Sequence, residues 1–194
     1  MIDAVLRGIK AVNRVILIGL GVLLWGGVMI VLLDITLRLA GSSLGGTDEI
    51  SGYLMAILAA WGMGYTLTAL GHIRIEALRD RCGTDLKLVL DVLAIASVAV
   101  VVTLIAVKGW PVFERSWLSD SRANTPLETL LWTVQLPWFL GWAWFALVAW
   151  VQFLAALVFI VRSEKLRAFD LIGTANELND LSDDDRSAQR GPQP

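Results

Sequence analysis

The sequence contains very few of the residues that build redox and metal centres. Its 194 residues include one cysteine, Cys82, and one histidine, His72. A lone cysteine excludes a disulfide within the chain and any paired-cysteine redox motif. A structural zinc site needs about four Cys or His ligands, and a haem held between two histidines needs a second one. We therefore expect this chain to carry no metal and no cofactor.

Charged residues are also scarce, at 18% of the chain, whereas 56% of the residues are hydrophobic. Soluble domains are roughly 45–50% apolar and about 25% charged. The apolar residues form four runs, at about 15–33, 50–70, 88–107 and 136–161, each reaching the ~20 residues that cross a bilayer. The sequence therefore predicts an all-α integral membrane protein with four transmembrane helices in a membrane domain over 15–162. This composition excludes a water-soluble enzyme. The lack of a Gly-rich phosphate-binding loop also excludes a subunit that uses ATP as its energy source.

The two ends of the chain differ from the membrane domain in their pattern. Residues 1–14 place apolar side chains at helical spacing, which predicts an interfacial amphipathic helix. A cleaved signal peptide is the alternative, although its apolar region is only about 7–15 residues long. Residues 163–194 are predicted to form a cytoplasmic tail, largely disordered from about residue 172, because polar residues dominate there.

A second interfacial helix is predicted between the third and fourth spans. Thr125 can cap a helix, Pro126 suits its first position, and Glu128 stands three residues after the cap. This pattern predicts a short helix over 126–135.

Lysine and arginine residues are distributed unevenly between the two sides of the membrane. Ten lie in the N-terminal segment, in the second loop and just after the fourth span, against four in the first and third loops. Because cytoplasmic segments carry an excess of these residues, both termini are predicted to be cytoplasmic.

The second span carries small residues at four-residue intervals. They are Gly52, Ala56, Ala60 and Gly64. Small residues at this spacing allow another helix to approach closely within a membrane. The stripe is therefore either a docking face for a partner subunit or a packing face for the chain's own spans.

Tryptophan is the most over-represented aromatic residue, with nine in the chain. Trp138 and Trp142 lie near the start of the fourth span. They fit either an aromatic belt at the membrane interface or a contact with another membrane protein. We therefore include both among the candidates for a partner interface.

Ionisable side chains lie at the ends of the spans rather than at their centres. Asp34 and Arg38 are four residues apart, so they are predicted to pair on one helix face. Asp48 and Glu49 begin the second span, where carboxylates can cap the helix or contact a partner. Since charges at mid-membrane mark ion pathways, the apolar span centres indicate no proton relay in this chain.

Several short motifs occur in an order and spacing that match a known family. Arg38 follows the first span, residues 48–54 read Asp-Glu-Ile-Ser-Gly-Tyr-Leu, and Trp61 and Gly64 follow within the second span. The later elements are Gly-His-Ile-Arg-Ile at 71–75, Thr125-Pro126-Leu127, Trp132, Leu136-Pro137 and Gly141. Over roughly 5–162 the chain resembles the small membrane subunit of tripartite ATP-independent periplasmic (TRAP) transporters, the DctQ-type small permease. It departs from the family pattern at Gly52 and Leu131, where the family often has arginine and proline.

The resemblance implies a non-enzymatic scaffold subunit in the bacterial inner membrane. Its partners would be a large permease subunit, a periplasmic solute-binding protein and membrane lipid, with no nucleic acid, and an ion gradient would drive the uptake of an organic acid. The structural-functional candidates are Arg38, Asp48, Glu49, His72 and Arg74. The alternatives are a self-sufficient, homo-oligomeric small transporter or channel and a membrane anchor subunit of an enzyme complex.

Overall fold

The computed structural model describes residues 2–71 and 83–172, and five helices account for their regular structure. The helices are α1 (Ile2–Leu39), α2 (Thr47–Thr68), α4 (Thr84–Leu118), α5 (Leu131–Val161) and α6 (Lys165–Ile172). The first four are long and apolar enough to cross a membrane. The prediction of an all-α membrane protein with four spans is therefore confirmed. Two of the predicted site residues, His72 and Arg74, lie outside the described residues.

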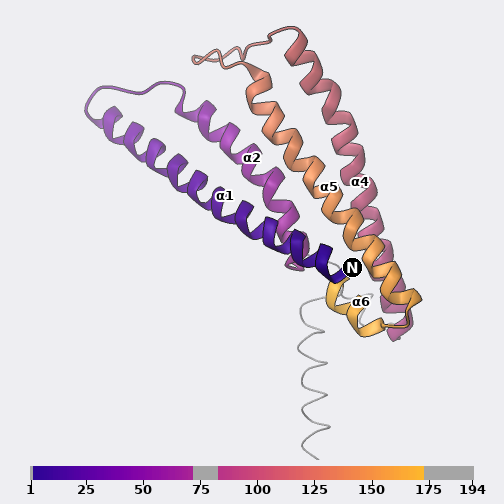
Figure 1. Ribbon diagram of the computed structural model, residues 1–194. Helices are drawn as coiled ribbons and strands as arrows, with labels where there is room; N and C mark the ends of the chain where they lie inside the picture. The colour runs from indigo at the N-terminus through magenta and orange to yellow at the C-terminus, as the bar shows by residue number, and fades with distance from the viewer. Residues whose placement is uncertain (1, 72–82, 173–194) are drawn as a thin grey trace, which may run out of the picture.

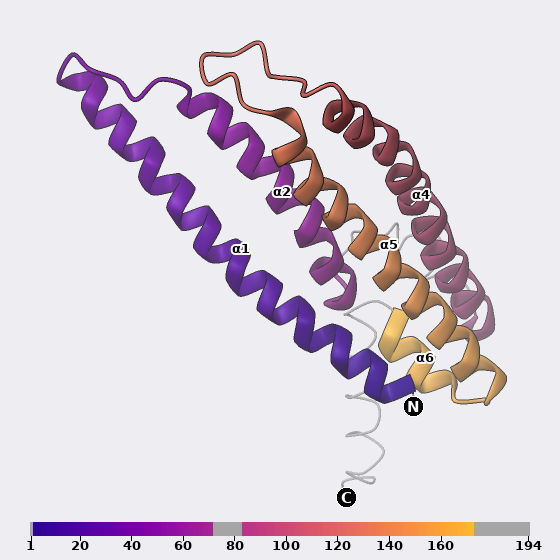
Figure 2. The ribbon, with the colours of Figure 1, turned by 45° about the horizontal axis from the view of Figure 1, so that its top comes forward.

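The four long helices lie in a row in which α5 occupies an inner position. It packs between α4 and α2, and α1 lies on the far side of α2 (Figure 1). The short α6 turns back at the end of α5 and lies near the start of α1 (Figure 2). An ion pair of 3.9 Å joins Arg167 of α6 to Asp3 of α1. The row leaves α1 and α4 at its edges.

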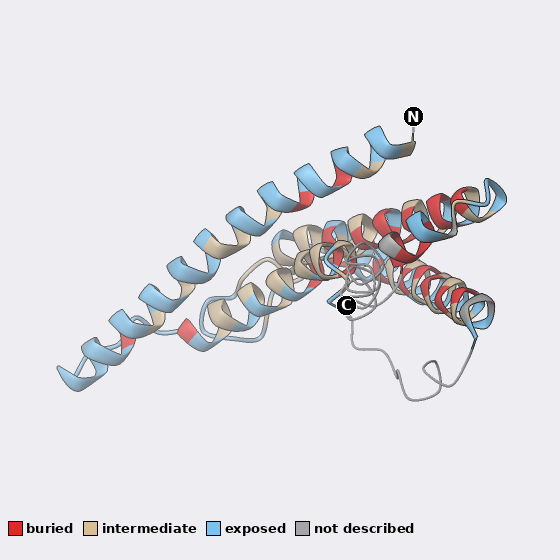
Figure 3. Ribbon diagram, turned by 90° about the horizontal axis from the view of Figure 1, so that it is seen from below, coloured by how far each residue is buried: buried red, intermediate tan, exposed pale blue. Residues whose placement is uncertain are grey.

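The buried core follows α5 and the faces of its neighbours, as the red segments of Figure 3 show. Val148 and Ala156 of α5 and Ala99 of α4 have no exposed surface. In α5, 44% of the most apolar segment is buried within the chain, compared with 6% in α1. The apolar surface of α1 is therefore available to lipid or to another protein.

The first helix joins the predicted interfacial segment 1–14 to the first span without a break. It has 38 residues and no proline. At a rise of 1.5 Å per residue it is about 57 Å long, compared with roughly 30 Å for the hydrocarbon core of a bilayer. The boundary at residue 14 is thus not a break in the helix, and the interfacial location of this segment stays a prediction.

The prediction of a separate interfacial helix over 126–135 is wrong, because residues 126–130 belong to a hairpin and residues 131–135 form the first turn of the membrane-spanning α5. The Ala123 N–H donates to the Thr129 carbonyl at 2.9 Å, across a turn in which the Glu128 N–H donates to the Thr125 carbonyl at 3.0 Å. Glu128 has φ 45°, which is incompatible with a right-handed helix. Thr125 and Glu128 therefore form a turn, and α5 begins at Leu131. The local capping pattern is overridden by contacts between this hairpin and the start of α2.

Part of the predicted tail is folded. Residues 165–172 form α6, which packs against α5 and α4. Ala168, Phe169, Leu171 and Ile172 are buried in this contact. These four apolar residues lie before the polar stretch from about residue 172 for which disorder is predicted. The composition of that polar stretch therefore says nothing about α6. Residues 173–194, for which disorder is predicted, lie outside the described residues.

Candidate functional site

The loop between α1 and α2 is organised around the buried carboxylate of Asp34. Arg38 Nε donates to Asp34 Oδ2 at 2.8 Å, and a second guanidinium nitrogen lies 2.7 Å from the same oxygen. The other oxygen, Oδ1, accepts from Ser43 Oγ at 3.0 Å and from the Leu44 backbone N–H at 2.8 Å. The Asp34 side chain is 3% exposed, whereas that of Arg38 is 53% exposed. The predicted pair of Asp34 and Arg38 is confirmed. Asp34 in addition accepts the hydrogen bonds from Ser43 and Leu44 that order the loop.

Glu49, in the first turn of α2, faces the hairpin that precedes α5. The Tyr53 hydroxyl donates to Glu49 Oε1 at 2.7 Å. The hydroxyls of Thr125 and Thr129 and the backbone N–H of Leu127 also face this carboxylate. Oε2 itself is buried without a hydrogen bond of standard geometry. These groups come from α2 and from the hairpin, so the Glu49 carboxylate lies where the hairpin, including residues 126–130, meets the start of α2.

The residues next to Glu49 complete this contact. Gly46 has φ 72°, a left-handed conformation that glycine adopts without strain. A Cβ atom at Gly46 would collide with the Leu127 side chain, so the missing side chain allows the hairpin to approach. Asp48 is exposed in the first turn of α2, where its charge complements the helix dipole. The structure therefore brings Arg38, Asp48 and Glu49 to the same end of the molecule.

A second polar cluster, away from the Asp34 loop, connects α1 and the last turns of α2 to the middle of α5. Asn13 is 1% exposed, and its Nδ2 donates to the Gly64 carbonyl at 3.0 Å and to Thr68 Oγ1 at 3.1 Å. Its Oδ1 accepts a hydrogen bond from Trp144 Nε1 at 2.8 Å. Asn13 is not among the residues predicted from the sequence, because it falls in the segment that is expected to lie at the membrane interface. An amide among apolar residues at helical spacing is the signal that could have revealed it.

The inner part of the small-residue stripe of α2 packs against α5. Ala60 has no exposed surface, and a Cβ atom on Gly141 would lie 2.8 Å from the Ala60 Cβ. Gly64 is also buried, and a Cβ atom there would approach Trp144 Cδ1 to 3.2 Å. The prediction of a partner interface is therefore corrected for Ala60 and Gly64. The alternative, packing against the chain's own spans, describes these two positions.

The outer part of the same stripe is less covered. A Cβ atom on Gly52 would have no neighbour within 4 Å, and Gly52 is exposed. Ala56 is half-buried, and the intervening Met55 is 71% exposed. The surface at Gly52 and Ala56 can therefore still accept another helix.

The sequence of the four-span region matches a known protein family. Residues 14–159 match the family described as tripartite ATP-independent periplasmic transporters, DctQ component. The chain belongs to this family. No curated protein and no solved structure matches it. The matched residues include most of α1 and nearly all of α5, so the family match extends over all four membrane-spanning helices.

Tryptophans join the helices of this DctQ-family chain. Trp61 Nε1 donates to the Pro137 carbonyl at 2.8 Å and so connects α2 to α5. Trp138 packs over Gly109 of α4, where a Cβ atom would lie 3.3 Å from its ring. Trp142 packs against the buried core, and its Nε1 is buried without a hydrogen bond. Trp138 and Trp142 thus have neighbours within the chain, and their contact with a partner stays a prediction.

These polar groups act by fixing the helices relative to one another. Asp34 orders one loop, Glu49 holds a hairpin, and Asn13 bridges three helices. Unsatisfied polar groups are costly in hydrocarbon, so such contacts favour one arrangement of the helices. In the DctQ component they therefore form the internal framework of a membrane subunit.

Proposed function

We propose that this chain is a non-enzymatic scaffold subunit that supports a large permease subunit and a periplasmic solute-binding protein. The complex would take up an organic acid, driven by an ion gradient. The family match over residues 14–159 carries this proposal. The sequence resemblance implies that the substrate and ion sites lie in the large subunit, so this chain would contribute surface and rigidity rather than chemistry.

The exposed apolar surface of α1 supports a scaffold role. Val22, Trp25 and Met29 are 70%, 66% and 54% exposed, and they belong to a helix that is largely uncovered within the chain. In a membrane such a surface meets lipid or the helix of a partner. Van der Waals packing and small residues allow membrane helices to associate without a hydrophobic driving force between them.

The outer part of α2 is the proposed contact with the large permease subunit. Gly52 and Ala56 lie where a partner helix could approach the backbone closely. The substitution Gly52→Leu should reduce co-purification of the large subunit. Gly62→Leu is the matched control, because Gly62 lies on the same helix outside the stripe and a Cβ atom there also has no neighbour within 4 Å. Equal recovery of the large subunit with both variants would exclude this face.

The proposed location is the bacterial inner membrane with both termini in the cytoplasm. In this orientation the Asp34 loop and the Glu49-bound hairpin face the periplasm, where the binding protein would dock. The excess of Lys and Arg in the terminal segments and second loop supports it. A C-terminal fusion to alkaline phosphatase should be inactive and a GFP fusion fluorescent, and the reverse result would overturn the orientation.

Uptake measurements test the function itself. Deleting the gene should abolish uptake of the cognate acid, and normal uptake without it would contradict the proposal. Liposomes containing this chain alone should transport nothing, whereas those containing all three components should transport. Transport by the chain alone would favour a self-sufficient homo-oligomeric transporter or channel. An enzyme activity in the purified complex would favour the anchor of an enzyme complex.

A further inference from the structure

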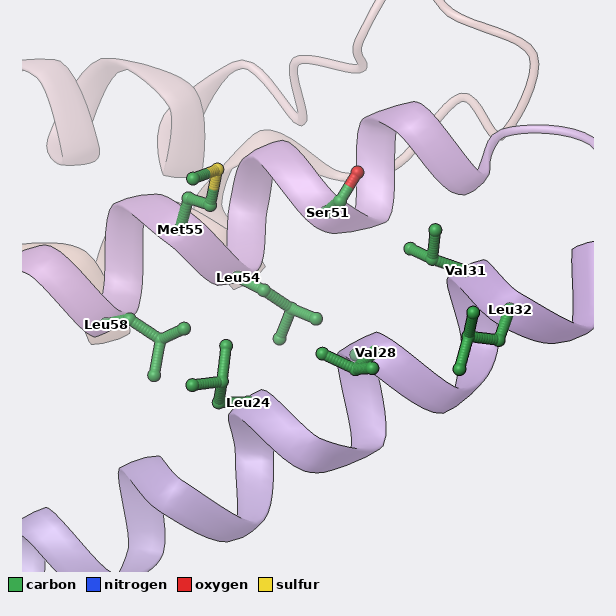
Figure 4. A pocket seen from close by; sticks show the side chains of 9 residues that line it. Leu24, Val28, Val31, Leu32, Ser51, Leu54, Met55 and Leu58 are labelled. Atoms are coloured by element: carbon green, nitrogen blue, oxygen red, sulfur yellow. The ribbon is translucent and has the colours of Figure 1, made fainter. Parts of the chain in front are cut away.

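A groove of about 210 Å³ runs between α1 and α2 in the half of the molecule that holds the Asp34 loop. Figure 4 shows the α1 and α2 side chains that line it. Leu24 and Val28 from α1 face Leu54 and Leu58 from α2 across it. The lining is apolar except for Ser51 near one end. We propose that this groove binds one acyl chain of a phospholipid whose phosphate interacts with Arg38.

The chemistry of the groove favours hydrocarbon as its occupant. It lies between two membrane-spanning helices, so the surrounding solvent at this depth is lipid rather than water. An empty apolar groove would deprive its lining of van der Waals contacts on one side. A flexible acyl chain can restore these contacts without bringing polar backbone groups into the groove.

A transmembrane helix fits this groove less well than an acyl chain does. A helix with its side chains is about 10–12 Å across. The two walls already touch within the groove, because a Cβ atom on Gly27 would lie 2.6 Å from Leu54 Cδ1. Close helix crossings in this chain use small residues, as at Ala60 and Gly141. Branched side chains form most of the lining of the groove, and they keep a helical backbone at a distance.

Arg38 supplies the charge that a phospholipid phosphate would meet. Gly27, Val31 and Arg38 share one face of α1, since they are separated by four and then seven residues. Arg38 lies about 10 Å along the helix from Val31, and its side chain reaches back one turn to Asp34. A guanidinium has five N–H donors, and Asp34 engages those on Nε and one terminal nitrogen. Because the side chain is 53% exposed, its remaining donors can bind a phosphate at the level of the headgroups.

The test uses the full chain, purified with whichever subunits stay bound and studied by native mass spectrometry. Val28→Trp places a large side chain in the groove and should remove one bound phospholipid. Val22→Trp is the matched control, because Val22 is on the same helix, is 70% exposed and does not line the groove. Equal retention of phospholipid by the wild type and both variants would overturn the proposal.

Photo-crosslinking of the wild-type chain keeps the proposal testable if a variant fails to fold. A phospholipid with a photoreactive acyl chain should label residues 24–32 and 51–58 severalfold more than the exposed part of α1 around Val15. Equal labelling of the groove segments and of the region around Val15 would refute a specific site. Retention of diacylglycerol as strong as that of the phospholipid would refute the role of Arg38. Crosslinking to a protein segment, from a photoreactive residue at position 28 in intact membranes, would show that a partner helix occupies the groove instead.

Discussion

Replacing Asn13 with leucine tests whether the polar cluster holds α1 against the other helices. The side chains are similar in size, so the substitution removes hydrogen bonds while keeping most of the packing. It deletes three hydrogen bonds of the Asn13 side chain. Two are donated to the Gly64 carbonyl and to Thr68 Oγ1, and one is accepted from Trp144 Nε1. The indole N–H of Trp144 then loses the acceptor that it has at the buried Asn13.

The expected cost follows from the number of hydrogen bonds and their environment. Hydrogen bonds between membrane helices contribute about 0.6 kcal/mol each on average, with a maximum of about 1.7 kcal/mol. Three such bonds give a loss of about 2 kcal/mol for Asn13→Leu. Trp144→Phe removes one bond and strands the Asn13 oxygen, for a loss of about 1 kcal/mol. In the Asn13→Leu background Trp144 has already lost its hydrogen bond to Asn13, so adding Trp144→Phe should cost little more. The double variant should therefore also lose about 2 kcal/mol.

Equilibrium unfolding in detergent, arranged as a double-mutant cycle, measures these values. The cycle should give a coupling free energy of about 1 kcal/mol between Asn13 and Trp144. Val15→Leu is the control, because Val15 is 70% exposed and should change stability little. Additive effects of the two substitutions, within about 0.5 kcal/mol, would refute the role of the cluster.

Three other contacts give predictions of the same kind. Gly141→Leu should destabilise the α2–α5 crossing by about 1–3 kcal/mol through overpacking against Ala60, measured by thermal unfolding; Gly62→Leu should cost less, since a Cβ atom there meets nothing within 4 Å. Asp34→Asn should loosen the α1–α2 loop, because it removes the negative charge that binds Arg38, and limited proteolysis at residues 40–46 should become faster. Glu49→Gln should raise hydrogen exchange in the hairpin 121–131, and unchanged protection there would show that other contacts hold it.

Local patterns in the sequence predicted the spans well and their connections poorly. The runs at 50–70 and 136–161 correspond closely to α2 and α5 because hydrophobicity over about 20 residues is itself the requirement for crossing a bilayer. The pairing of Asp34 with Arg38 was predictable because helical spacing alone brings residues four apart together. The helix over 126–135 failed because its capping residues also suit a turn, and contacts with Glu49 and Gly46 decided between the two.

The sequence by itself determined the class of protein, its four spans and its family, since these depend on composition and motifs read along the chain. The tertiary structure alone decided which faces are covered. Trp144 and Asn13 are 131 positions apart, and Trp61 is 76 positions from the carbonyl that it binds. Such partners depend on how helices cross, which periodicity within one helix cannot specify. The stripe of small residues on α2 is an example. The same four-residue spacing places Ala60 in the contact with α5 and leaves Gly52 exposed, where a partner could approach.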